Sequence, residues 1–138
     1  MQGPFRADRA LIPGVIEEVL RCRPPVPQAY RIANEDVPVA GEVVPANGFV
    51  TVSVLSANHD ERQFSDPDRF DPHRDPNKHI AFGHGIHFCL GAPLARLEVG
   101  IALNRLFDEL AELRVGDDIT FHDTDFYGAK RMTVTARR

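Results

Sequence analysis

The segment Phe-Gly-His-Gly-Ile-His-Phe-Cys-Leu-Gly, at positions 82–91, constrains the fold more than any other part of this sequence. Its first two glycines, Gly83 and Gly85, can adopt positive φ angles, so the backbone can reverse and approach a flat ligand closely. Cys89 follows, just before the strongest helical pattern in the chain. At a helix N-terminus, unpaired N–H groups and the helix dipole lower the pKa of a thiol. The segment therefore predicts a turn that presents Cys89 as a thiolate.

The same segment is similar to the cysteine-ligand loop of the cytochrome P-450 family, Phe-Gly-x-Gly-x-(Arg or His)-x-Cys-x-Gly, and matches every fixed position. A lone cysteine at a helix end is more often a small buried hydrophobic residue than a ligand, but the surrounding pattern favours the ligand. The resemblance implies that Cys89 is the proximal thiolate ligand of a haem iron and favours O–O cleavage. It also implies that Phe82 shields the sulfur, that His87 bonds a haem propionate, and that Gly91 lets the helix start close to the ring.

A Glu-x-x-Arg spacing upstream places Glu18 and Arg21 on one face of a predicted helix. Alone, this spacing is typical of a solvated ion pair worth about 0.2–0.5 kcal/mol. It also resembles the family's Glu-x-x-Arg motif, whose partner arginine lies in a later meander, and the matching segment Phe70–Arg74 supplies Arg74. The resemblance implies a buried structural triad that braces the cysteine loop through bidentate guanidinium bonds. His73 departs from the family, because many relatives carry glutamate there.

Two positions between these motifs show how far the resemblance extends. Arg31 is similar to the strand arginine that binds a haem propionate in bacterial relatives; the alternative is an ordinary arginine on an edge strand. His59 occupies a position where arginine is frequent in the family, and the resemblance assigns no role to it. The implied cofactor is haem b, iron protoporphyrin IX, with Cys89 as the metal ligand. The implied cofactor-binding residues are Cys89, Phe82, Gly83, Gly85, His87, Gly91 and Arg31.

Hydrophobic periodicity and turn residues divide the chain into helical, extended and irregular parts. The predicted order is a short helix over Leu11–Cys22, small antiparallel strands over 29–55, a meander over 56–78, the cysteine loop, a long helix from Leu90 and a terminal hairpin over 119–135. This order indicates an α+β fold, and the resemblance implies that it is equivalent to the C-terminal part of the cytochrome P-450 fold. Residues 1–138 are therefore interpreted as a single partial domain, the proximal haem-binding portion.

Composition excludes several other classes of protein. With 43% apolar residues and a formal charge of −4, the chain is expected to be a soluble folded domain and not a nucleic-acid binder. It has neither an apolar run of the ~18 residues that cross a bilayer nor an apolar signal core, so we expect a cytoplasmic protein. Both cysteines should be thiols there, with Cys22 a packed one. The spacing of His79, His84 and His122 is not metal-like, and surface or loop positions explain them.

The resemblance covers only the last third of a typical family member. The sequence does not match the long central helix whose acid–alcohol pair delivers protons to bound dioxygen. We therefore expect a haem-thiolate monooxygenase, of the soluble bacterial type that inserts one oxygen atom from O2 into an organic substrate, but truncated and not active alone. The alternatives are a non-catalytic haem-binding or interaction module and an inert gene fragment. The sequence does not reveal which substrate is used.

The same resemblance implies partners. A ferredoxin-type protein would donate electrons, and a small organic substrate would touch Val26–Ala29 and the hairpin tip at Phe126–Gly128. Without the central helix, one face of the haem would be open, and exposed apolar patches usually mark association. We therefore expect self-association or a partner that covers this face.

Overall fold

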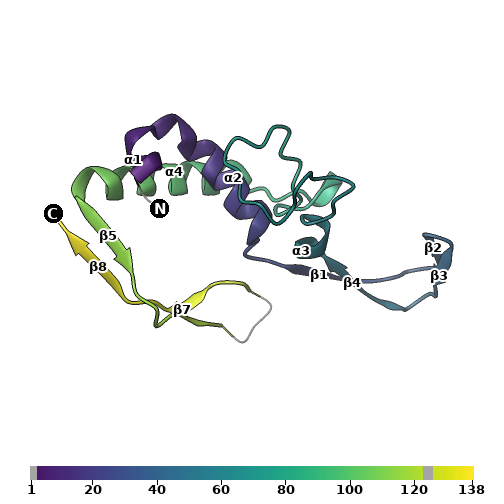
Figure 1. The fold of residues 1–138 in the computed structure, drawn as a ribbon. Coiled ribbons are helices and arrows are strands. Elements are labelled where there is room, and N and C mark those ends of the chain that lie inside the picture. Colours follow the sequence, from purple (N-terminus) through teal and green to yellow (C-terminus); the bar gives the residue numbers. More distant parts are fainter. Residues whose placement is uncertain (1–2, 123–125) are drawn as a thin grey trace.

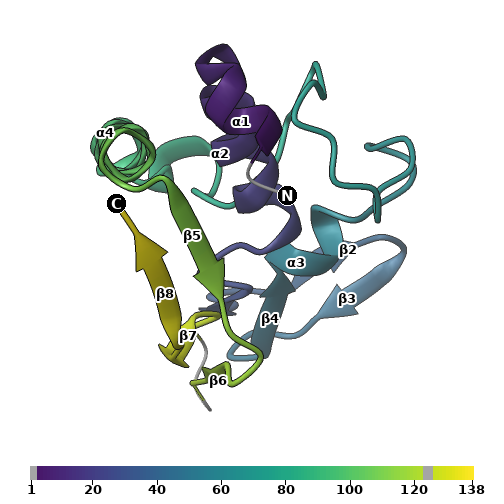
Figure 2. The same cartoon turned by 60° about the vertical axis from the view of Figure 1, so that its left-hand side comes forward.

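The computed structural model describes residues 3–122 and 126–138. Two packed helices, α2 (Ile12–Cys22) and α4 (Ala92–Glu109), form its centre, and two β arms extend from them (Figure 1). The turned view in Figure 2 also places α2 beside α4, with the β5–β8 hairpin leaving the end of α4. The mixture of helices and small antiparallel strands confirms the predicted fold class.

The first helix starts one residue later than predicted, at Ile12, with Pro13 in its first turn. A proline is tolerated there because the first N–H groups of a helix have no intrahelical partner. The helix ends at Cys22, before Pro24, as the sequence predicts. It is preceded by two short helical segments, α1 (Gly3–Ala7) and η1 (Arg9–Leu11).

The long helix does not begin at Leu90, as the sequence pattern predicts, but at Ala92. Leu90 lies in the turn ahead of the helix and is 98% exposed. The apolar spacing already begins at Leu90, before the true start of the helix. Gly91 in the cap position and Pro93 in the first turn set the boundary. Cys89 therefore lies three residues before the first helical residue.

All strand pairs in the described residues are antiparallel. The pairs are β1 (Gln28–Ile32) with β4 (Phe49–Ser53), β2 (Val37–Val39) with β3 (Glu42–Val44), β5 (Glu112–Val115) with β8 (Val134–Arg137), and β6 (Thr120–Phe121) with β7 (Ala129–Arg131). The predicted terminal hairpin is thus two successive pairs, and it begins earlier than residue 119, because Glu112–Val115 pairs with the end of the chain. The β6–β7 tip encloses residues 123–125, which lie outside the described residues.

The meander predicted from its proline steps is present as backbone without helix or strand between Asn58 and His84. It follows the short helix α3 (Val54–Ala57) and leads into a 3-10 turn, η2 (Gly85–His87). Turns and side chains from α2 fix the backbone of this meander. Backbone without helix or strand needs such partners, because its N–H and C=O groups are not paired within regular structure. The meander therefore packs against α2 in space and leads along the chain into the cysteine loop.

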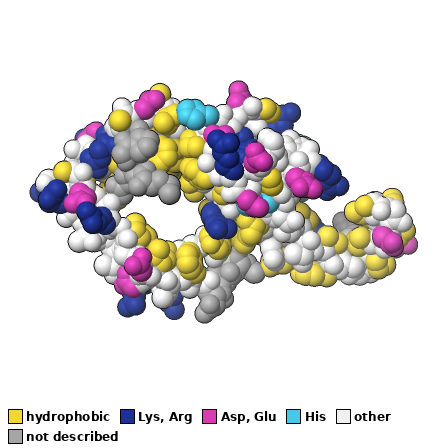
Figure 3. Space-filling view, in the orientation of Figure 1, with side chains coloured by type: hydrophobic (Ala, Val, Ile, Leu, Met, Phe, Trp, Pro, Cys, Tyr) yellow, Lys and Arg dark blue, Asp and Glu magenta, His cyan; other side chains and the backbone are white. Residues whose placement is uncertain are grey.

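The apolar core is small for a chain of this length. Among the described residues, the buried hydrophobic side chains of this core are Ile12, Ile16, Val54, Phe64 and Ala92. The solvent-accessible surface is 10229 Å², whereas a compact monomer of this mass exposes about 7,200 Å². Figure 3 shows an opening between the helices and the C-terminal strands, with hydrophobic side chains along its edge. Among the described residues, the helices are too short or too polar to span a membrane.

Candidate functional site

The cysteine loop folds back on itself, and its ends are joined by a main-chain hydrogen bond from the Cys89 N–H to the Phe82 carbonyl oxygen, at 2.9 Å. This reversal uses positive φ angles at Gly83 (77°) and Gly85 (68°). A side chain at either position would be strained, since L-residues rarely adopt these angles. Both glycines therefore have the role in the turn that the sequence predicts.

Gly91 has a different role from the other two glycines. Its φ is −80°, and a Cβ built on it would lie 3.8 Å from the Cys89 sulfur, an ordinary contact. Neither backbone angle nor space requires glycine there in the chain as it stands. A side chain at this position would, however, cover the flank of the sulfur.

A cavity of about 350 Å³ opens beside the loop. Its lining residues are Leu20, Pro25, Val26, Ala29, Arg31, Val54, Ile80, Ala81, Phe82, Gly83, His87 and Cys89. The cavity thus brings together the predicted ligand, Cys89, and both predicted propionate partners, Arg31 and His87. The guanidinium of Arg31 also donates to the Tyr30 carbonyl oxygen at 2.7 Å. Gly85 and Gly91 are not among the lining residues.

The residues of this cavity fit a haem. An apolar wall suits a flat apolar ring, a thiolate is a suitable iron ligand, and two basic side chains suit the propionates. Cys89 itself is exposed, so its sulfur is accessible to a ligand. The substrate-contact segment predicted at Val26–Ala29 reaches the same cavity through Val26 and Ala29.

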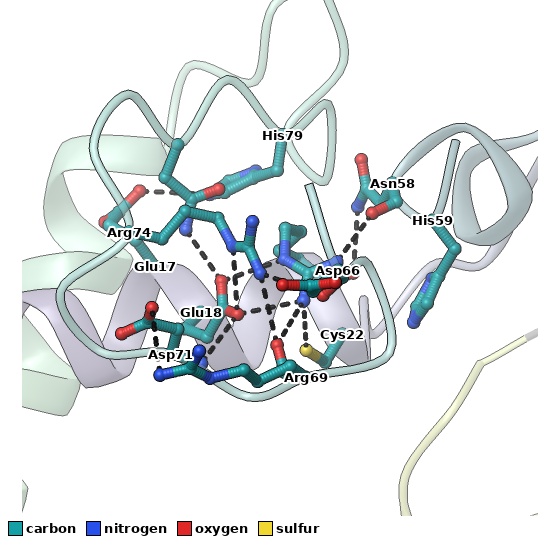
Figure 4. Close-up of polar contacts among 12 residues, drawn as sticks. Glu17, Glu18, Cys22, Asn58, His59, Asp66, Arg69, Asp71, Arg74 and His79 are labelled. Carbon is teal, nitrogen blue, oxygen red and sulfur yellow. Dashed lines mark hydrogen bonds and ion pairs between the residues drawn. The ribbon is translucent and has the colours of Figure 1, made fainter. Parts of the chain in front are cut away.

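The predicted triad residues lie in contact (Figure 4). Arg21 donates two hydrogen bonds of 2.8 Å to the carboxylate of Glu18, and Arg74 donates one of 3.2 Å. The side chains of Glu18 and Arg21 are 0% exposed, and that of Arg74 is 9% exposed. The pair is therefore not the solvated one that its spacing alone would suggest. Arg74 bonds Glu18 although its neighbour His73 departs from the predicted motif.

Burial alone would raise the pKa of Glu18, but hydrogen bonds from Arg21, the Asp71 N–H and Arg74 outweigh it and lower the pKa to about 2. Arg74 also donates to the carbonyl oxygens of Ser65, Asp66 and Arg69. The network thus fixes the meander on α2 through one carboxylate. None of the three triad residues lines the cavity beside Cys89.

Two asparagines that the sequence motifs do not indicate complete this network. Asn77 donates to Glu18 at 3.0 Å, and the buried Asn58 accepts from the Ile80 N–H and donates to the Arg21 carbonyl oxygen. Asn58 links the triad to the segment just before the cysteine loop. No local spacing signals these contacts, because each partner is 22 or more residues away.

Two other expectations can be compared with the structure. Cys22 is half-buried and accepts a hydrogen bond from Arg21, and burial raises its pKa, so it is a packed thiol as predicted. His79 is not on the surface: its side chain is 3% exposed and contacts Glu17 at 3.0 Å. Of the two predicted positions, surface or loop, His79 therefore has the loop one, and the meander folds it against α2.

Comparison with known proteins gives consistent matches. The cytochrome P450 family model matches residues 5–115. Cyclomarin C epoxidase CymV of Salinispora arenicola is 54% identical over 120 residues, which cover 86% of this chain and 30% of that protein. The ligand-free structure of cytochrome P450 TbtJ1 superposes with a TM-score of 0.93 at 51% identity, over 98% of this chain and 36% of that one.

A second solved structure, CYP109B1 from Bacillus subtilis, superposes with a TM-score of 0.90 at 44% identity, over 96% of this chain and 36% of that one. The chain thus spans about a third of the length of these relatives. The family match covers most of the chain, including the Glu-x-x-Arg helix, the meander and the cysteine loop. The chain belongs to the cytochrome P450 family.

Proposed function

We propose that this chain is the proximal haem-binding part of a cytochrome P450 monooxygenase, which inserts one oxygen atom from O2 into an organic substrate. The observation that carries the proposal is the cavity in which Cys89, Arg31 and His87 meet beside an apolar wall. Family membership supports the reaction class. The cofactor proposed is haem b.

When bound, a thiolate-ligated haem supplies the O–O cleavage chemistry of this family. The chain's own residues hold it and set its surroundings. Cys89 would ligate the iron as a thiolate, and Phe82 would pack beside the sulfur and limit water access. Arg31 and His87 would bind the propionates, while the network around Glu18 would keep the meander and the cysteine loop in place.

Substrate would meet this chain at two segments that the fold brings close together. The Tyr127 N–H donates to the Pro25 carbonyl oxygen at 2.7 Å, so the tip of the terminal hairpin contacts the segment after α2. The guanidinium of Arg23 lies 5.6 Å from the Tyr127 ring centroid. We propose these two segments as the substrate contacts, in a cytoplasmic protein that receives electrons from a ferredoxin-type donor.

An absorbance spectrum tests the proposal. Purified protein is loaded with haem, reduced and exposed to carbon monoxide. A Soret band at the position of thiolate-ligated haem supports the proposal. Protein that does not take up haem, or whose band has the position of nitrogen-ligated haem, contradicts it. Oxygen activation also needs groups on the other haem face, so we expect no turnover by the 138 residues alone.

The alternative is a non-catalytic haem-binding or interaction module, and the large exposed surface favours it as a second candidate. The accessible area exceeds that of a compact monomer by roughly 3,000 Å², which is more than a standard protein interface buries. Substrate oxidation by the chain, with a reductant and ferredoxin supplied, would exclude this alternative. An inert fragment would show neither haem binding nor a partner.

A further inference from the structure

A second charged network centres on Glu17, the residue before Glu18 on α2. Glu17, on α2, receives two hydrogen bonds from Arg96, on α4: Nε to Oε1 at 2.6 Å and Nη2 to Oε2 at 2.8 Å. The same carboxylate contacts His79 Nε2 at 3.0 Å (Figure 4). These three residues join α2, the end of the meander and α4.

The tautomer of His79 follows from its two partners. The Ala81 N–H points at Nδ1, at 3.2 Å, and an N–H can only donate, so Nδ1 accepts. Nε2 then carries the proton of the neutral ring and donates to Glu17. Glu17 thus accepts hydrogen bonds from two different elements, and its pKa is lowered, chiefly by the bond from Arg96. The carboxylate is the centre of this network.

The network surrounds the ring of Phe82. The guanidinium of Arg96 lies 4.7 Å from the ring centroid, within the range of a cation–π contact. The rings of His79 and Phe88 each lie 6.4 Å from it, centroid to centroid. Phe82 is also the residue whose carbonyl oxygen receives the Cys89 N–H. Phe82, which the network contacts, therefore restrains Cys89 through this hydrogen bond.

Phe82 is also a shared wall between two cavities. It lines the cavity that contains Cys89, and it lines an apolar cavity of about 350 Å³ between α2 and α4. Arg96 is among the residues of the second cavity and not of the first. The guanidinium thus contacts Phe82 from the cavity between α2 and α4.

We propose that Glu17 is a positioning residue for Cys89: it orients Arg96 and His79 against Phe82, and Phe82 fixes the conformation of the cysteine loop. A simple link between α2 and α4 would need only the ion pair. The planar guanidinium on the ring and the hydrogen-bonded His79 add nothing to such a link, but they restrict where Phe82 can lie. The inference concerns the loop itself and does not require that haem is bound.

Hydrogen exchange at the Cys89 amide, in the haem-free full chain, measures the loop directly. Glu17→Gln removes the charge that orients Arg96, and Arg96→Lys keeps a positive charge but loses the planar contact with Phe82. Both substitutions should accelerate exchange at Cys89 by about five- to thirtyfold. The control Glu112→Gln breaks a similar pair with Arg114, on β5, and should leave Cys89 unchanged.

Two amides elsewhere separate a local effect from general loss of stability. The Ala33 N–H donates to the Gly48 carbonyl oxygen, and the Gly116 N–H donates to the Thr133 carbonyl oxygen, next to the ends of two different strand pairs. Faster exchange at Cys89 with no change at these two amides supports the inference. Equal acceleration at all three, or Cys89 exchange in both variants that matches Glu112→Gln, overturns it.

The absorbance spectra of the same variants can be measured after haem is added. Glu17→Gln and Arg96→Lys should lower the fraction of the reduced carbon monoxide complex that shows the thiolate band, whereas Glu112→Gln should not. If the exchange result is positive but no form of the chain binds haem, the proposed function fails and the positioning role remains. If haem binds normally and the exchange at Cys89 is unchanged, the positioning role fails alone.

Discussion

At the scale of single residues, Glu18 accepts more hydrogen bonds than its sequence motif indicates. The Glu-x-x-Arg spacing and its resemblance predict the partnership with Arg21 and Arg74, and both contacts are present. They do not predict the hydrogen bonds from the Asp71 N–H and Asn77. Those partners are fixed only when the meander folds over α2, so no local pattern encodes them.

Replacement of Glu18 by glutamine should destabilise the fold. The neutral amide would leave the two buried guanidinium groups without a charge partner, and breaking a buried pair costs about 3–5 kcal/mol. Urea unfolding should show a loss of this size. The exposed pair provides the control: Glu112→Gln should cost less than about 1 kcal/mol. Equal losses in the two variants would show that burial adds nothing to the Glu18 network.

The lowered pKa of Glu18 also predicts how stability depends on pH. The value in the folded chain is about 2, against 4.5 for a free side chain. The stabilisation is therefore fully present above pH 4.5 and is lost as the pH falls toward 2; it amounts to about 3 kcal/mol. Unfolding free energies measured over this range should fall in the wild type and be flatter in Glu18→Gln. A wild-type curve that is equally flat would contradict this explanation.

At the scale of elements, the sequence predicts the order of helices, strands and meander, because periodicity and proline steps are local signals. It misses the start of α4, because Leu90 continues the apolar spacing into a turn. It also misses the link from α2 to α4. Glu17 and Arg96 are 79 residues apart and carry no motif. Contacts between elements depend on packing, which a pattern in one segment does not contain.

Two helical glycines should respond to alanine in opposite directions. A Cβ at Gly14 would lie 2.0 Å from the Pro72 carbonyl oxygen, so α2 and the meander would have to separate. Overpacking of this kind costs about 1–3 kcal/mol. A Cβ at Gly100 would lie 3.9 Å from Ile16, an ordinary contact, and glycine within a helix costs about 0.5–1 kcal/mol relative to alanine.

Thermal unfolding should therefore show a lower midpoint for Gly14→Ala and a higher one for Gly100→Ala. The pair serves as its own control, since each variant adds the same methyl group to a helix. A higher midpoint for Gly14→Ala would show that the meander is not packed on α2 as described.

At the scale of the whole molecule, the chain exposes more surface than a compact monomer would, and large hydrophobic side chains contribute to it. On α4 alone, Leu94, Leu97 and Ile101 are 57%, 59% and 55% exposed. Leu97 and Ile101 are four residues apart and lie together in a shallow groove on the helix. Surface of this kind usually marks an interface.

We therefore expect the isolated chain to associate through this face. Sedimentation velocity of the wild type should show oligomers whose share rises with concentration. Leu97→Glu combined with Ile101→Glu should shift the protein toward monomer without changing its circular dichroism, because both side chains are already exposed. A wild type that stays monomeric at all concentrations, with a sharp thermal transition in the absence of haem, would contradict this expectation.

The two cysteines allow the most direct test of the central claim, that Cys89 is the haem ligand. One is exposed beside the cavity, and the other is half-buried against Arg21. Wild type, Cys89→Ser and Cys22→Ser would each be loaded with haem, reduced and exposed to carbon monoxide. We predict the thiolate Soret band in the wild type and in Cys22→Ser, and its loss in Cys89→Ser. A thiolate band that persists in Cys89→Ser, or one that disappears in Cys22→Ser alone, would contradict the claim.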